Sequence, residues 1–226
     1  MKFPSTFFIM ARIFSHLNQE WIDTHVGVNN GAFWYSKELL ENIAPKIKTD
    51  RGWCLINVDN QCEDRMIVFI HNNAHPESYY WLANYKDLIL VCSQLKTLKT
   101  MIEMFPKFHC ILLPLSIDTE YVKKFKVKRK TKDTAFLGRL VKCPKDIMEN
   151  DKIVKLGNGS RDDLLKQVAK FKNVYAIGRC ALEAKCLGCK VTSHKGEYKG
   201  VDFKLLDNSE VIPILQKRLN EIDGVV

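Results

Sequence analysis

The sequence predicts an α/β protein with two lobes, each built on a parallel β-sheet flanked by helices. Short apolar runs of strand length recur along the chain, and segments with helical periodicity lie between them. A strongly basic stretch separates two series of such units. The 226 residues, 46% of them hydrophobic and 27% charged, are enough for two compact lobes with buried cores.

The individual elements follow from the apolar patterns. Strands are expected at residues 7–14, 53–58, 66–70, 88–92, 110–113, 135–137, 153–156, 174–177 and 190–193. Helices are expected at residues 36–47, 93–104, 161–171 and 209–222, and a further helix should follow Gly178. Ser160 is placed to cap the helix that begins at residue 161, with Asp163 at the capping-box position.

The basic stretch at residues 123–132 has no apolar periodicity and is expected to be a solvated connector. We therefore expect an N-terminal lobe of residues 1–115 and a C-terminal lobe of residues 116–226. The alternative for this stretch is a surface that binds nucleic acid or another polyanion, which the formal net charge of +9 would favour. Only Phe125 within it is available to stack on bases.

The cysteines and the apolar segments indicate a cytoplasmic protein. The eight cysteines lie mostly inside apolar stretches instead of at the spacings of a disulfide framework. No apolar run reaches the length of a membrane helix. The apolar residues 3–14 are expected to form a first buried strand, because no small-residue cleavage pattern of a signal peptide follows them.

The strongest functional signal lies at residues 173–191, which read NVYAIGRCALEAKCLGCKV. An apolar strand leads through Gly178 and Arg179 into a helix that carries Glu183. Ligands of open α/β sheets bind outside the carboxyl ends of the strands, and a helix N-terminus offers N–H groups to phosphate. Arg179 would add a charged fork for phosphate, and Glu183 would accept hydrogen bonds from ribose. The alternative is a surface ion pair of Arg179 with Glu183 at i, i+4 spacing.

This segment resembles the donor-binding segment of GT-B glycosyltransferases, where a strand, a turn and a helix with a Glu-Ala pair precede a glycine and a short strand. Residues 134–140 (TAFLGRL) are similar to that family's first C-lobe strand and Gly-Arg turn, here Gly138 and Arg139. In the family a following lysine, here Lys142 or Lys145, clamps the pyrophosphate. Residues 87–93 (DLILVCS) and 111–118 (ILLPLSID) are similar to the last N-lobe strand and the crossover into the C-lobe.

The resemblance implies two Rossmann-like lobes with a donor cleft between them. It implies a nucleoside-diphosphate sugar held by the C-terminal lobe and an acceptor that enters over the N-terminal lobe. The expected activity is that of a hexosyltransferase-like glycosyltransferase, which moves the sugar to an acceptor hydroxyl with retention. Acceptor candidates are a membrane-associated lipid-linked sugar, a cell-wall polymer, or a modified base in DNA.

Two departures from the family favour a second hypothesis. Many retaining members carry another glutamate eight residues before the position of Glu183, and this sequence has Tyr175 there. The chain is also shorter than most GT-B enzymes. The alternative is therefore a non-catalytic nucleotide or nucleic-acid binding module that retains a degenerate GT-B fold.

The N-terminal lobe supplies three candidate residues. Asn30 and Gly31 belong to a loop, residues 28–32, that resembles the family's glycine-containing loop under the donor; an ordinary Asn-Gly turn is the alternative. His71 follows the expected strand 66–70 and is our candidate catalytic residue, facing the substrate. A zinc site with His75 is disfavoured because Pro76 keeps the preceding residue out of helical geometry.

No metal or other cofactor is expected beyond the nucleotide sugar itself. No Asp-x-Asp pair follows a strand, so Arg139, Lys142 and Arg179 would neutralise the departing diphosphate in place of a metal. The glycines at 157 and 159 do not continue into a dinucleotide fingerprint, since Asp162 stands at the third glycine position. The cysteines at 186 and 189 close a helix and are interpreted as buried structural residues.

Overall fold

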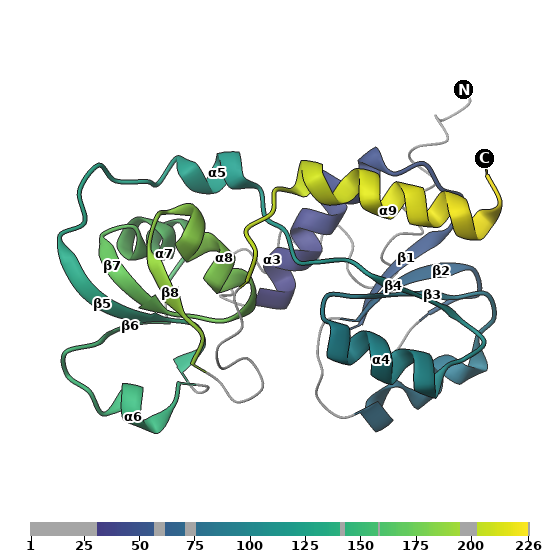
Figure 1. Ribbon diagram of the computed structural model, residues 1–226, viewed down its shortest axis with the longest axis horizontal. Helices are drawn as coiled ribbons and strands as arrows, with labels where there is room; N and C mark the ends of the chain where they lie inside the picture. Colours follow the sequence, from purple (N-terminus) through teal and green to yellow (C-terminus); the bar gives the residue numbers. More distant parts are fainter. Residues whose placement is uncertain are drawn as a thin grey trace. The chain divides into compact units, whose positions relative to one another are not determined.

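The computed structural model describes residues 31–56, 62–70, 76–140, 143–157, 159–194 and 203–225. In this part of the chain the strands form two four-stranded parallel sheets with helices against them (Figure 1), which confirms the predicted fold class. The contacts divide the chain into two compact units. The first unit contains Tyr35–Pro114 and the residues from Ser209 on, and the second contains Trp34 and Leu115–Asn208.

The first sheet holds strands β1 (Gly52–Ile56), β2 (Met66–Ile70), β3 (Ile89–Cys92) and β4 (His109–Leu112), in that order. All pairings are parallel, and Val68 lies opposite Cys54 on one side and Leu90 on the other. Every residue of β2 and β3 is buried. These continuous apolar runs are typical of parallel strands that are covered on both faces.

The first unit contains the helices α4 (Leu95–Met104) and α9 (Asn208–Asp223). It also contains the helix α3 (Gly31–Glu38) from Tyr35 on. That helix continues as the π-helical η1 (Leu39–Ile43) and the 3₁₀-helical η2 (Ala44–Lys46), and a second 3₁₀ segment, η3 (Pro76–Asn84), was not expected from the sequence. Figure 1 shows α4 and α9 on opposite sides of the sheet.

The closing helix α9 groups with the first unit, although the sequence placed residues 116–226 in one lobe. Its Val211, Leu215 and Leu219 are buried. A buried arginine also holds its end: Arg51, 4% exposed, donates from Nη2 to Asp223 Oδ1 at 2.6 Å and from Nη1 to the carbonyl of Asp87 at 2.8 Å. The change of unit after Pro114 falls where the sequence placed the lobe boundary.

The second sheet has the order β6-β5-β7-β8 and is also parallel. Its strands are β5 (Lys132–Leu137), β6 (Val154–Leu156), β7 (Phe171–Tyr175) and β8 (Lys190–Thr192). Ala135 in β5 lies opposite Val154 in β6 and Val174 in β7. The carboxyl ends of β5, β6 and β7 therefore meet at one edge of the sheet.

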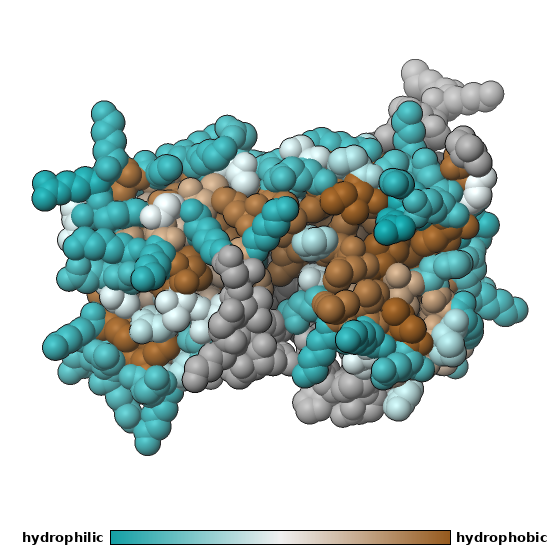
Figure 2. All heavy atoms as spheres, viewed as in Figure 1, coloured by the Kyte–Doolittle hydropathy of each residue, from teal (hydrophilic) through white to brown (hydrophobic). Residues whose placement is uncertain are grey.

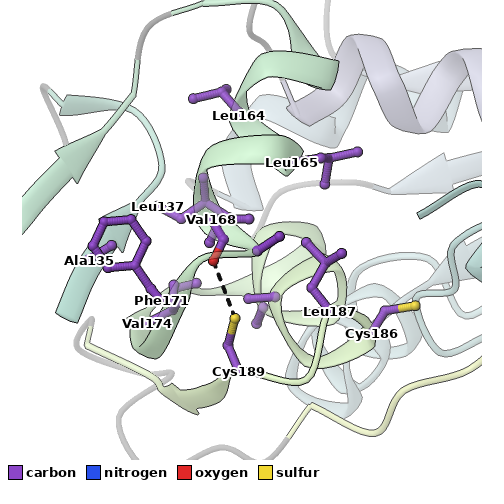
Figure 3. Packing of buried hydrophobic residues seen from close by; sticks show 14 of the residues in the cluster. Ala135, Leu137, Leu164, Leu165, Val168, Phe171, Val174, Cys186, Leu187 and Cys189 are labelled. Carbon is purple, nitrogen blue, oxygen red and sulfur yellow. Dashed lines mark hydrogen bonds between the residues drawn. The ribbon is translucent and has the colours of Figure 1, made fainter. Parts of the chain in front are cut away.

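Helices cover both faces of this sheet (Figure 1). They are α5 (Thr119–Lys123), α6 (Lys145–Met148), α7 (Arg161–Val168) and α8 (Gly178–Cys186). Figure 3 shows Val168 of α7 beside Leu137 of the sheet. Leu164 and Phe171 belong to the same core, which α8 completes. On the other face, Ile147 of α6 packs near Phe136.

The capping of α7 follows the sequence prediction. The Ser160 side chain accepts a hydrogen bond from the Asp163 amide at 3.2 Å, and its hydroxyl donates to Asp163 Oδ2 at 2.7 Å. The helix ends earlier than the expected residue 171, because Phe171 already opens β7.

The basic stretch at residues 123–132 is more structured than a solvated connector. Lys123 closes α5, and Lys132 opens β5. Lys130 Nζ donates to the carbonyl of Ala169 at 2.7 Å and to that of Leu187 at 2.7 Å. These two residues are the C-caps of α7 and α8, so Lys130 satisfies carbonyls where the helix dipole favours a cation.

The two cysteines at the end of α8 are buried and reduced, which confirms their structural interpretation. The Cys189 thiol donates to the Val168 carbonyl at 3.5 Å (dashed in Figure 3), whereas the Cys186 thiol donates to the Thr119 carbonyl at 3.6 Å. All eight cysteines of the chain are free thiols.

Exposed apolar residues gather on one face of the first unit. Figure 2 shows brown surface there between α9 and α4. The side chains of Ile102, Leu112 and Ile214 are 49%, 40% and 43% exposed. None of the described helices is long and apolar enough to cross a membrane.

Candidate functional site

A small pocket lies at the carboxyl edge of the second sheet. It has a volume of about 50 Å³. Its lining comes from the end of β5, from the helices α7 and α8, and from α3. The lining residues are Trp34, Leu137, Gly138, Arg139, Arg161, Leu164, Leu165, Arg179, Cys180 and Glu183. A complete drug-sized ligand occupies several hundred Å³, so this pocket can take one small group of a larger ligand.

The turn after β5 brings Gly138 and Arg139 to the pocket. A neighbouring glycine shapes this turn: a Cβ on Gly157 would lie 2.7 Å from the Gly138 carbonyl oxygen and 2.5 Å from Leu140 Cγ. Only glycine permits so close an approach. The Arg139 side chain is exposed at the rim.

The turn after β7 leads directly into α8. Gly178 has φ +57°, a left-handed conformation that favours glycine, and no atom lies within 4 Å of the position that its Cβ would take. The N-cap residue, Ile177, has no side chain that bonds the first amides of α8. The helix N-terminus thus presents N–H groups and a partial positive charge beside the pocket.

Three charged side chains from α7 and α8 form a buried cluster in the pocket wall. Arg161, Arg179 and Glu183 are 8%, 8% and 7% exposed. Arg161 reaches Glu183 Oε1 with Nε at 3.2 Å and Nη2 at 3.0 Å, and Arg179 Nε donates to the same oxygen at 3.0 Å. With the exposed Arg139, the lining contains three arginines and one glutamate, so it carries an excess of positive charge.

Two aromatic rings flank the guanidinium group of Arg161. Its central carbon lies 5.0 Å from the Trp34 ring centroid and 5.1 Å from that of Tyr121. The Tyr121 hydroxyl donates to Asp162 Oδ1, which fixes the ring from its far end. Burial and the Asp162 carboxylate raise the pKa of Tyr121 to about 12, so this hydroxyl keeps its proton at neutral pH.

The pocket also contains a thiol. Burial raises the pKa of Cys180 to about 12, and the negative charge of Glu183 acts in the same direction. A thiol with such a pKa remains protonated at neutral pH and is a poor nucleophile. Cys180 therefore acts as a small apolar part of the lining.

The structure brings together the candidate residues from two separate motifs. Gly138 and Arg139 from the first, and Arg179 and Glu183 from the second, line one pocket. Gly178, the first residue of α8, precedes Arg179 and is not part of the lining. Lys145 does not reach it: the residue begins α6 on the other face of the sheet, and its side chain is 86% exposed.

The remaining candidates belong to other parts of the chain. Gly31 is the first residue of α3, so the described end of the expected loop 28–32 is helical. Asn30, Lys142 and His71 lie outside the described residues.

Arg179 and Glu183 form the ion pair at i, i+4 spacing that the sequence offered as an alternative, but the pair is buried and does not lie on the surface. The Glu183 carboxylate accepts from Arg161 and Arg179. A ribose contact of Glu183 stays a prediction. Sequence reasoning missed Arg161, Trp34 and Tyr121. A signal existed for Arg161, because it opens a helix just after β6, at the same edge as Gly138.

No known family model matches this chain, and no curated protein matches it. Among the described residues, no three or more His, Cys, Asp or Glu side chains are grouped so that they could hold a metal ion.

Proposed function

We propose that this chain is a glycosyltransferase that binds a nucleoside-diphosphate sugar at the pocket of its second unit. One observation carries the proposal. Two segments that resemble donor-binding motifs, one with Gly138 and Arg139 and the other with Gly178 and Arg179, are distant in the sequence. Both contribute to one pocket at the carboxyl edge of the parallel sheet. This edge is where ligands of open α/β sheets bind.

The charge of the pocket supports an anionic ligand group. Arg139, Arg161 and Arg179 outnumber the single carboxylate of Glu183, and the uncapped N-terminus of α8 adds partial positive charge. The volume suits one phosphate-sized group, with the nucleoside and sugar outside the pocket. Guanidinium groups bind phosphate oxygens through paired hydrogen bonds.

In this proposal Glu183 organises the arginines instead of binding ribose. Its carboxylate lies between two buried guanidinium groups that would otherwise repel each other. Arg139 and Arg179 then present N–H groups toward the diphosphate, while Arg161 holds the carboxylate that Arg179 contacts. Such preorganised charge stabilises a leaving diphosphate without rearrangement.

The rest of the reaction is proposed on the resemblance alone. His71 would be the catalytic residue, and the sugar would be transferred with retention and without a metal. A cytoplasmic setting is part of the proposal and agrees with the eight free thiols. The acceptor would be a membrane-associated glycan precursor or a polyanion such as modified DNA.

A non-catalytic nucleotide-binding module is the second candidate. Tyr175, which stands where many retaining members carry a glutamate, packs against the Phe136 cluster on the α6 face of the sheet. Its side chain does not line the pocket. A module of this kind would bind the diphosphate through the same arginines and would not turn over a sugar donor.

Two measurements test the proposal and separate its two forms. A thermal-shift screen of the full chain against UDP, GDP, ADP and their sugar conjugates should find a stabilising ligand, since a ligand at 100 times its dissociation constant adds about 2.7 kcal/mol. Release of nucleoside diphosphate from the matching nucleotide sugar would support a transferase. Binding without release would support the module, and no stabilisation by any compound would contradict both.

A further inference from the structure

The guanidinium group of Arg161 contacts two aromatic rings in addition to its ion partner Glu183. It lies over the rings of Trp34 from α3 and Tyr121 from α5, with ring centroids at 5.0 and 5.1 Å. A guanidinium group over aromatic faces gains cation–π attraction, and each such contact restricts its rotation. The two rings therefore favour one orientation of its N–H groups.

Hydrogen bonds connect Arg161 to the other two members of the charged cluster, Glu183 and Arg179. Arg161 donates from Nε and Nη2 to Oε1 of Glu183, the atom that also accepts from Arg179 Nε. One oxygen is thus held by side chains from two helices. A displacement of Arg161 would therefore alter the hydrogen bonds of both Glu183 and Arg179.

Tyr121 supports the arrangement from outside the pocket. Its hydroxyl donates to Asp162, the neighbour of Arg161, and its amide donates to Oδ1 of Asp118 at 2.9 Å at the start of α5. Tyr121 is not among the residues that line the pocket. Its ring contacts the lining residue Arg161, so it can affect a ligand in the pocket through Arg161.

We propose that Arg161 is a positioning residue for diphosphate recognition, held by Trp34 and Tyr121, and that it sets the geometry of Glu183 and Arg179. The inference rests on the proposed function, because it concerns a ligand of the same pocket. Lysine at this position would keep the charge but would lack the planar group that both rings contact.

Calorimetric titration of the full chain with UDP, GDP and ADP tests the inference, with circular dichroism to establish that each variant is folded. For the diphosphate that the unmodified chain binds most tightly, Arg161→Lys should lower the affinity by about tenfold or more, because charged hydrogen bonds to the ligand are misplaced. Lys166→Met, an exposed change on the same helix, is the control and should bind as the unmodified chain does. A purely structural role would lower stability and leave the affinity of the folded protein unchanged.

A second pair of variants covers the case in which Arg161→Lys does not fold. Tyr121→Leu should weaken diphosphate binding, and Tyr121→Phe, which keeps the ring, should recover most of the lost affinity. Equal affinity of the folded Leu and Phe variants would overturn the inference, as would Arg161→Lys binding like the unmodified chain. Failure of the unmodified chain to bind any of the three diphosphates would instead refute the proposed function, and the inference with it.

Discussion

Arg161 and Glu183 lie 22 positions apart in the sequence and form a buried ion pair with an N–O distance of 3.0 Å. Both side chains are less than a tenth exposed. A buried carboxylate between two guanidinium groups compensates charges that would be costly to leave unpaired. This relationship makes Glu183 part of the framework of the second unit as well as of its pocket.

Glu183→Ala should therefore destabilise the protein. Removing one partner of a buried ion pair costs about 3–5 kcal/mol, because the remaining charge stays buried and uncompensated. Urea denaturation followed by circular dichroism measures the change in the free energy of unfolding. Glu149→Ala is the matched control, since that side chain is 65% exposed and pairs with Lys145 only at 3.7 Å. Equal stability of the two variants would show that the cluster contributes nothing to folding.

Lys130 should contribute more to stability than its neighbours in the basic stretch. Lys130→Met removes hydrogen bonds to the C-cap carbonyls of α7 and α8, and we expect a loss of about 1–3 kcal/mol. Lys128→Met changes an exposed residue and should have little effect. Thermal denaturation of both variants makes the comparison. A larger loss for Lys128→Met would refute the capping role.

The cysteines should differ in reactivity as their pKa values predict. A hydrogen bond from Cys54 lowers the pKa of Cys62, whereas burial raises that of Cys180 to about 12. Between neutral pH and pH 9, Cys62 should therefore be thiolate more often than Cys180 and should alkylate first. Timed iodoacetamide labelling of the folded protein, read by peptide mass spectrometry, checks the order. Labelling of Cys180 ahead of Cys62 would contradict the assignment.

Diphosphate binding should need no divalent cation, because three guanidinium groups and the α8 N-terminus supply the positive charge. The affinity for the best-binding nucleoside diphosphate should be the same in EDTA and in magnesium. Calorimetry under the two conditions measures it. Loss of binding in EDTA that magnesium restores would show that a metal contributes to the site.

The strands could be predicted from the sequence because each is a short apolar run between turn residues. Eight strands form within a few residues of their expected positions, as at Met66–Ile70, and the expected strand at residues 7–14 lies outside the described residues. The pocket was also predictable in part. Gly138 and Gly178 each follow a strand, and parallel strands end at the same edge.

Side-chain partners could not be predicted in the same way. The sequence places Arg161 at the start of a helix but does not say that its side chain contacts the rings of Trp34 and Tyr121, which are distant in the chain. Lys130 looked solvated within a run of bases, yet its long aliphatic stem lets the ammonium group reach buried carbonyls. The place of α9 depends on contacts of Arg51 with Asp223, which are 172 positions apart.

Diphosphate affinity in two arginine variants tests the central claim most directly. Arg139→Gln removes an exposed guanidinium group from the pocket rim and should leave the fold intact. Arg129→Gln removes another exposed guanidinium group, from the basic stretch, and is the control. In calorimetric titrations, Arg139→Gln should weaken binding of the preferred nucleoside diphosphate by about tenfold, the value of one charged hydrogen bond, and Arg129→Gln should not change it. Equal affinities of both variants and the unmodified chain would contradict a diphosphate site in this pocket.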